Sequence, residues 1–321
     1  MPSRCFWAIF DGMIIDAHAH IFSRIDGLIG EGTTESAPYG AALIGGKELV
    51  QVLPPLNPET THPPEMLLEG MAWAGVDKAV LLQGSFYGAR NDEVREACAK
   101  YPDRLVGAAF LDPWESGAKD EFSKLFDEQK FPILKMEIRH ETGLGGLHPG
   151  FKLDDPDLHW LWDGLDERGV VLTLDPGKVG GRSYQTAAIH GIIESHPDMT
   201  FVLCHLGFPT RELDGNTVLQ EQWEEFVKLG QLPNVWFDLS ALPHRAEEIY
   251  PFPQLGAWLR RGLDLIGPDK MMWGTDVPGL FTAGNYQQLL SSYQEHLSHL
   301  SESEQAGVFG ETAAKVYPFV S

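Results

Sequence analysis

Residues 13–20 read MIIDAHAH, a short apolar run that ends in polar residues, and this pattern decides the fold. The pattern recurs along the chain, and stretches with helical periodicity lie between the runs. The other seven runs are 77–84 (DKAVLLQG), 104–111 (RLVGAAFL), 131–139 (FPILKMEIR), 169–175 (GVVLTLD), 200–206 (TFVLCHL), 234–240 (NVWFDLS) and 270–276 (KMMWGTD). We therefore expect eight strands, each ending in polar side chains.

Amphipathic segments separate these runs, and strands that alternate with helices indicate a parallel sheet. The clearest segments are 64–74, 92–100, 157–168, 186–195, 221–229 and 254–266. Eight such units close into a (β/α)8 TIM barrel of about 250 residues, which insertions can enlarge. The sequence thus predicts one domain over residues 1–321, in which 1–12 form an N-terminal extension.

The surplus length lies in loops that leave the predicted C-terminal ends of the strands. Residues 21–63 are rich in Gly and Pro and are expected to form a long loop or lid after the first strand. A second long connection, 140–156, follows the fourth strand. In barrel enzymes this face carries the site, so we expect both loops to border it.

The composition limits the partners of the protein. The 321 residues contain 24 Lys and Arg against 46 Asp and Glu, a net charge of −22, which disfavours nucleic acids and anionic membranes. The three cysteines, Cys5, Cys98 and Cys204, form no CxxC pair, so neither a disulfide framework nor a thiolate zinc site is indicated. No apolar run approaches the roughly 20 residues that span a bilayer. We expect a cytoplasmic protein that acts on a small molecule.

His18 and His20 lie two positions apart at the end of the first predicted strand. Strict alternation puts Ile14, Asp16 and both histidines on one side of that strand. Two neutral imidazole nitrogens on one face suit a single cation. The alternative is a pair of hydrogen-bonded polar residues at a strand end.

Further polar residues end the other strands. They are Glu137, Arg139, Asp175, His205, Asp238, Ser240 and Asp276. Charges inside a barrel are costly to bury unless they are paired or bind a metal, so several at one end imply a compensating ion. The alternative for Lys135, Glu137, Arg139 and Asp238 is a structural ion-pair network.

Four motifs resemble the amidohydrolase superfamily, most closely its branch of aminocarboxymuconate-semialdehyde decarboxylase and related decarboxylases and lactonases. They are DAHAHIF (16–22), CHLG (204–207), WGTDVP (273–278) and VFGETAAKVYPF (308–319). The resemblance implies a distorted barrel with one divalent ion, usually zinc and sometimes manganese. It further implies that His18, His20 and Asp276 are ligands and that His205 faces the reacting water or substrate.

Asp175 departs from this pattern, because the decarboxylase branch usually has a histidine ligand there. Either Asp175 is a carboxylate ligand, which would favour harder ions such as manganese, or the position has left the metal. The second case resembles the pyrone-dicarboxylate and sugar-lactone hydrolases of the superfamily. The sequence leaves both open.

The residues are thus consistent with a metal-dependent hydrolase that attacks a lactone, ester or amide of a small, carboxylated substrate, with Asp276 or His205 accepting the proton from water. Decarboxylation of an aromatic or dienoic acid is the alternative, and a non-catalytic binding barrel is the third hypothesis. The residues expected to contact substrate are Arg139, Glu137, His140, His244, Phe22 and Phe86. Relatives of this kind often pair, so a homodimer is expected.

Overall fold

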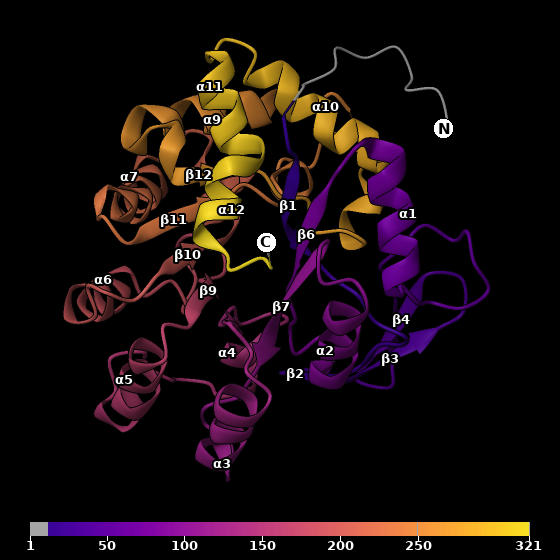
Figure 1. Ribbon diagram of the computed structural model, residues 1–321, viewed down its shortest axis with the longest axis vertical. Coiled ribbons are helices and arrows are strands. Elements are labelled where there is room, and N and C mark those ends of the chain that lie inside the picture. Colours follow the sequence, from indigo (N-terminus) through magenta and orange to yellow (C-terminus); the bar gives the residue numbers. More distant parts are fainter. Residues whose placement is uncertain (1–11, 249, 321) are drawn as a thin grey trace.

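The structure is a computed structural model that describes residues 12–248 and 250–320, so most of the expected extension at 1–12 lies outside the described residues. A barrel of eight parallel strands stands at its centre, with helices around it (Figure 1). In order around the sheet the strands are β1 (Ile15–Ala19), β6 (Lys78–Leu81), β7 (Leu105–Phe110), β8 (Ile133–Glu137), β9 (Val171–Asp175), β10 (Phe201–Leu203), β11 (Val235–Asp238) and β12 (Met271–Met272). Each lies within one of the eight runs noted in the sequence.

The last strand returns to the first and closes the barrel. The Ala17 amide donates to the carbonyl oxygen of Trp273 at 3.0 Å, and the Asp276 amide donates to that of His18 at 2.7 Å. Ala19 and Val277 form a parallel bridge beyond them. The predicted (β/α)8 TIM barrel is therefore confirmed.

Helices fill the connections between the strands, and six of them fall on the six amphipathic segments. In chain order the helices of the described residues are α1 (Pro64–Ala74), α2 (Asn91–Lys100), α3 (Ala118–Ser123), α4 (Leu144–Leu147), α5 (His159–Glu167), α6 (Thr186–Ser195), α7 (Thr217–Val227), α8 (Leu242–Arg245), α9 (Pro253–Ile266), α10 (Tyr286–His296), α11 (Glu302–Ala306) and α12 (Thr312–Val316), and the six on the amphipathic segments are α1, α2, α5, α6, α7 and α9. Local signals set their ends: α1 begins with Pro64 and stops at Gly75, whose φ of 81° suits glycine. Among the described residues, no helix combines the length and apolar character needed to cross a membrane.

The end of the barrel opposite the site is closed by the C-terminal segment. An inner apolar cluster takes residues from all eight strands, such as Ile15, Val80 and Val202, together with Val316 and Tyr317. The Tyr317 hydroxyl lies 3.2 Å from Thr173 Oγ1 on β9. Figure 1 shows α12 and the chain end crossing the barrel centre. Because apolar side chains fill this end of the barrel, the polar residues at the strand ends lie at the opposite end.

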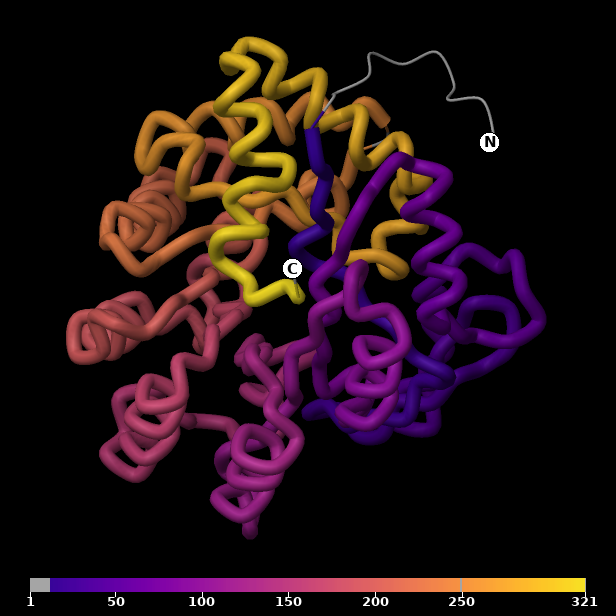
Figure 2. The backbone as a smooth tube through the Cα atoms, viewed as in Figure 1, coloured from indigo at the N-terminus to yellow at the C-terminus, as the bar shows by residue number. Residues whose placement is uncertain are grey.

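The expected loop at 21–63 instead contains a four-stranded antiparallel sheet, order β2-β3-β4-β5. Its strands are β2 (Asp26–Ile29), β3 (Gly32–Ala37), β4 (Ala41–Ile44) and β5 (Glu48–Gln51). Figure 2 shows this segment as an indigo excursion beside the barrel, next to α1. The β2 edge is tied to the loop after β6, because the Leu28 amide donates to the Ser85 carbonyl oxygen at 3.0 Å. Its role as a lid stays a prediction.

Candidate metal centre and active site

His18 and His20 reach the barrel interior because β1 is irregular. Ile15 and Ala17 belong to the inner apolar cluster, so strict alternation would send both histidines outward. The pairing register with β6 shifts between Asp16 and Ala19. Asp16 Oδ1 accepts hydrogen bonds from the amides of His18 (3.0 Å) and Thr275 (2.9 Å), which fixes this bend. The expectation that Asp16 shares a face with the histidines is therefore corrected.

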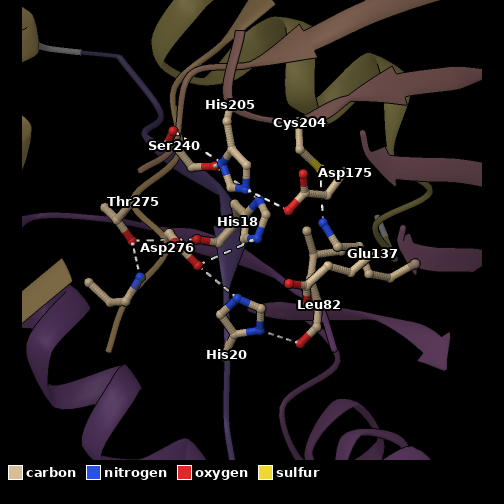
Figure 3. Close-up of polar contacts among 12 residues, drawn as sticks. His18, His20, Leu82, Glu137, Asp175, Cys204, His205, Ser240, Thr275 and Asp276 are labelled. Carbon is tan, nitrogen blue, oxygen red and sulfur yellow. Dashed lines mark hydrogen bonds and ion pairs between the residues drawn. The ribbon is translucent and has the colours of Figure 1, made fainter. Parts of the chain in front are cut away.

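His18, His20 and Asp276 form a cluster whose potential ligand atoms all lie within 4.8 Å of one another. Asp276 Oδ1 lies 2.9 Å from His20 Nε2 and 3.7 Å from His18 Nε2. Tetrahedral zinc with bonds of about 2.0–2.1 Å separates its ligands by about 3.3 Å. The observed spacings bracket that value, so these three side chains fit one ion (Figure 3).

The hydrogen bonds of the two histidines aim both Nε2 atoms at the cluster. His20 Nδ1 lies 2.9 Å from the carbonyl oxygen of Leu82, which can only accept, so Nδ1 carries the proton. His18 Nδ1 lies 3.0 Å from Asp238 Oδ2. Burial lowers the pKa of His18 to about 4, although Asp238 opposes the shift, so the ring is neutral near pH 7. An unprotonated Nε2 beside a carboxylate is the arrangement that a cation satisfies.

Asp276 is held at the barrel mouth by an unusual backbone. Its φ of 71° lies in the left-handed region, which is uncommon for a residue other than glycine. The amide hydrogen bond to the His18 carbonyl oxygen stabilises this conformation. Burial would raise the pKa of Asp276, but the close contact with His20 and the nearby His18 and His205 hold the pKa below its usual range. The carboxylate is therefore ionised and available to a metal.

His205 follows β10 in a segment with the same kind of strain: φ is 58° at His205 and 50° at Leu206. Strain of this kind gathers at functional sites. Its Nδ1 lies 2.8 Å from Ser240 Oγ and 3.2 Å from the Ser240 carbonyl oxygen, so Nδ1 donates and Nε2 is free to exchange a proton. The imidazole stacks on His18 with ring centroids 4.9 Å apart. Figure 3 shows His205 beside His18 at the cluster.

Asp175 lies with His205 rather than within the three-residue cluster. Its Oδ2 is 3.4 Å from His205 Nε2, and its Oδ1 accepts a hydrogen bond from the Gly177 amide at 2.8 Å. Burial would raise the pKa of Asp175, but His205, Lys135 and Arg139 lower it overall. The carboxylate thus faces the proton-exchanging nitrogen of His205.

Asp238 connects His18 with His205. Its Oδ2 pairs with His18 Nδ1, and its Oδ1 accepts from the His205 amide at 3.0 Å and from the Ser240 amide and hydroxyl. Lys135, one of the four residues of the alternative ion-pair network, donates to Cys204 Sγ at 2.9 Å. The network alternative applies more closely to Arg139 and Glu137, whose Nε and Oε1 lie 3.6 Å apart.

Two arginines stand over one aromatic ring near the site. The guanidinium carbons of Arg139 and Arg245 lie 5.0 and 3.9 Å from the ring centroid of Phe208. The Nε atom of each is buried, and neither guanidinium makes a hydrogen bond within 12–248 and 250–320. Burial and the neighbouring Arg139 lower the pKa of Arg245 to about 10, although the negative charges of Asp276, Asp175 and Glu137 oppose this shift. Buried guanidinium donors without hydrogen-bond partners are suited to an anion.

The other residues expected to contact substrate make no hydrogen bond or ion pair with His18, His20 or Asp276 within the described ranges. Phe22 is fully buried and stacks on Tyr87 at 4.9 Å, whereas Phe86 is half-buried and meets the same ring edge-on. His140 is half-buried and its Nδ1 lies 3.2 Å from the Gly145 carbonyl oxygen. His244 is exposed on α8. Glu137 lies beside Arg139, and its Oε1 accepts a hydrogen bond from the Thr142 hydroxyl at 2.6 Å.

Tyr87, Arg245 and Ser240 also lie near the site, although the sequence pattern assigns no role to them. The Tyr87 ring lies 5.0 Å from that of His20, and burial, with the charges of Asp276 and Glu137, raises the pKa of its hydroxyl. The strand-end position of Ser240 was a usable signal. Tyr87 and Arg245 lie in connections beyond the strands, where periodicity gives no orientation.

Comparisons with known proteins find chains that are similar to this one. A curated L-fucono-1,5-lactonase from Burkholderia multivorans is 28% identical over 141 residues, which cover 41% of this chain and 48% of the lactonase, so the match spans about half of that relative. An amidohydrolase from Burkholderia multivorans with bound zinc superposes with a TM-score of 0.69 at 20% identity, covering 95% of this chain and 99% of the other. A probable 2-pyrone-4,6-dicarboxylic acid hydrolase from Acinetobacter baumannii with bound citric acid has a TM-score of 0.68 at 18% identity, covering 94% and 98%.

The two solved structures show the same fold, and the family comparison covers the site. The model for the family described as amidohydrolase matches residues 15–319, which include β1, β12 and every residue of the cluster. With nearly the whole described barrel inside that match, the chain belongs to the amidohydrolase family.

Proposed function

We propose that this protein is a metal-dependent hydrolase that opens the cyclic ester of a small, carboxylated lactone. The observation that carries the proposal is the cluster of His18, His20 and Asp276 beside two arginines without hydrogen-bond partners in the described ranges. The first element suits water activation and the second suits an anionic substrate. The similarity to a lactonase supports the choice of a lactone over an open-chain ester or amide.

The ion proposed here is zinc, held by His18, His20 and Asp276, with manganese as the alternative. Two imidazoles and one carboxylate form a donor set that zinc takes in catalytic sites. A similar structure contains zinc, which supports the same choice. When bound, a divalent ion polarises a carbonyl group and lowers the pKa of water.

The proton is handled by the chain's own residues. Asp276 or His205 accepts a proton from water as its oxygen attacks the lactone carbonyl carbon. As the ring carbon–oxygen bond breaks, a proton passes to the departing oxygen and a hydroxy acid results. The hydrogen bond that His205 Nδ1 donates to Ser240, together with the nearby Asp175 carboxylate, keeps His205 Nε2 oriented for this exchange.

The substrate carboxylate would lie against Arg139 and Arg245. Both guanidiniums rest on Phe208, which fixes their planes and limits the entropy lost on binding. A guanidinium can bind a carboxylate through two parallel hydrogen bonds. On a chain of net charge −22, this local positive charge is what an anion requires.

A panel of substrates tests the proposal. The zinc-loaded protein is mixed with lactones that carry a carboxylate, with uncharged lactones and with hydroxybenzoates, and proton release and carbon dioxide are recorded. Proton release from the carboxylated lactones is the expected result. Carbon dioxide from hydroxybenzoates without lactone opening would favour the decarboxylase considered from the sequence, and no turnover with any compound would favour the binding barrel. Homodimer formation also stays a prediction.

A further inference from the structure

A cavity lies outside the cluster, between the small sheet and the outer helices. It has a volume of about 280 Å³. Its walls come from the turn between β3 and β4, from the segment after β5, from α1 and from the segment that leads from β12 into the start of α10. The lining residues are Gly40, Leu53, Pro54, Leu56, Asn57, Glu59, Thr61, His62, Met66, Gly70, Trp73, Pro278, Phe281, Asn285 and Tyr286.

The lining is mainly apolar and partly open to solvent. Leu56 is 82% exposed, Trp73 56% and Met66 40%, all on the rim of one cavity. Apolar groups concentrated in a concave surface mark ligand sites more often than scattered exposed residues do. A cavity of about 150 Å³ already holds benzene in another protein, so this one has room for a substituted aromatic ring.

The cavity is lined by a buried histidine, His62, whose ring has one nitrogen without a hydrogen bond to any described residue. His62 is 2% exposed, and its Nδ1 lies 2.9 Å from the carbonyl oxygen of His20, so Nδ1 donates toward β1. Nε2, on the opposite edge of the ring, makes no hydrogen bond with any described residue. Because a carbonyl oxygen can only accept, Nδ1 carries a proton, and Nε2 is the ring nitrogen left to accept a hydrogen bond from a ligand.

The charges around the cavity exclude an anion. Among the lining residues, all within the described ranges, there is no Lys or Arg, while Glu59 contributes a negative charge. A carboxylate would lose its hydration without gaining a counter-ion. This lining contrasts with the arginine-rich surroundings of Phe208, so the two sites differ in the chemistry that they accept.

We propose that this cavity is a second ligand site, which binds an uncharged aromatic compound carrying one O–H or N–H donor to His62 Nε2. The ring would pack between Trp73, Met66 and Phe281. The ligand would also lie against Pro278, two residues beyond Asp276. The proposal does not depend on the reaction at the cluster, and its test uses binding alone.

Phenol, toluene and benzoate are matched probes for this site. Protein labelled with 13C at the methionine methyl groups is titrated with each compound, and the Met66 signal, assigned with Met66→Leu, reports binding in the cavity. Met199 is buried near β10 and serves as the internal reference. We expect saturable shifts at Met66 with phenol, binding about 3- to 10-fold weaker with toluene because one hydrogen bond is missing, and no saturation with benzoate.

A pair of glycine variants locates the binding. A Cβ on Gly70 would lie 3.4 Å from Tyr286, so Gly70→Leu places its side chain in the cavity without a backbone clash. Gly191 on α6 has nothing within 4 Å, so Gly191→Leu is the matched control in open solvent. Gly70→Leu should abolish the phenol response, and Gly191→Leu should retain it. Trp73→Ala, at an exposed position, should weaken phenol binding even if Gly70→Leu folds poorly.

Three results would overturn the proposal. The first is a Met66 signal that does not respond to phenol. The second is phenol binding by folded Gly70→Leu as tight as by Gly191→Leu. The third is equal affinity for toluene and phenol, which would remove the role assigned to His62.

Discussion

Replacing Asp238 by Asn should weaken zinc binding although Asp238 is not itself one of the three proposed ligands. Asp238 Oδ2 accepts the Nδ1 proton of His18 at 3.0 Å, and both side chains are buried. Its Oδ1 already accepts three hydrogen bonds, from His205 and Ser240. The amide NH2 of Asn would therefore face His18 Nδ1, donor against donor, and favour the tautomer that has its proton on Nε2.

The size of the effect follows from the bond that is lost. A hydrogen bond to a charged group is worth about 1.5–3 kcal/mol, and each 1.4 kcal/mol is about tenfold in affinity. We expect zinc affinity to fall by roughly 10- to 100-fold, the range typical of partners that orient a metal-binding histidine. Competition with a chromophoric chelator measures it.

A second Asp–His pair provides the control. Asp112 Oδ2 lies 2.7 Å from His148 Nε2, away from the cluster, so Asp112→Asn makes the same chemical change elsewhere. Its zinc affinity should match that of the unaltered protein. If Asp238→Asn, shown to be folded, binds zinc as tightly as Asp112→Asn, the assigned role of Asp238 is incorrect.

Further expectations concern the anion site, the acid stability and the closed end of the barrel. Arg245→Met should raise KM for a carboxylated lactone by about 10- to 100-fold and leave KM for an uncharged lactone nearly unchanged; equal effects would argue against carboxylate binding. Burial lowers the pKa of His62 from 6.5 to about 4, so its contribution to stability is present above pH 6.5 and is lost as the pH falls toward 4. That loss is roughly 3 kcal/mol in urea unfolding, and it should be missing in His62→Gln, where an unchanged pH dependence would contradict the assignment. Tyr317→Ala should destabilise the fold by about 3–5 kcal/mol, because the ring fills the inner cluster; a loss below 1 kcal/mol would refute that role.

The barrel could be predicted because its strands are buried on both faces. Runs such as 77–84 and 104–111 are then nearly continuous in apolar residues, a signal that does not depend on distant contacts. The sheet β2–β5 carries no such signal. β3 reads GTTESA and is mostly exposed, so its strands are held by hairpin pairing and by contact with the loop after β6.

The site could be predicted in part for a related reason. His18 and His20 are close in sequence, and parallel strands bring Asp276 and His205 to the same end of the barrel. The contact between His18 and Asp238 joins residues 220 positions apart, and its orientation depends on the shift in β1 at Asp16. Arg245 lies in a short helix after β11, where only the packed structure shows which side chain faces the site.

The central claim is that one ion binds between His18, His20 and Asp276, and anomalous diffraction from zinc-soaked crystals tests it most directly. We expect one peak per chain, about 2.0–2.2 Å from both Nε2 atoms and a carboxylate oxygen of Asp276. A peak among His18, Cys204 and Asp238, the other cluster with suitable spacing in the described residues, would contradict it, as would no peak at saturating zinc.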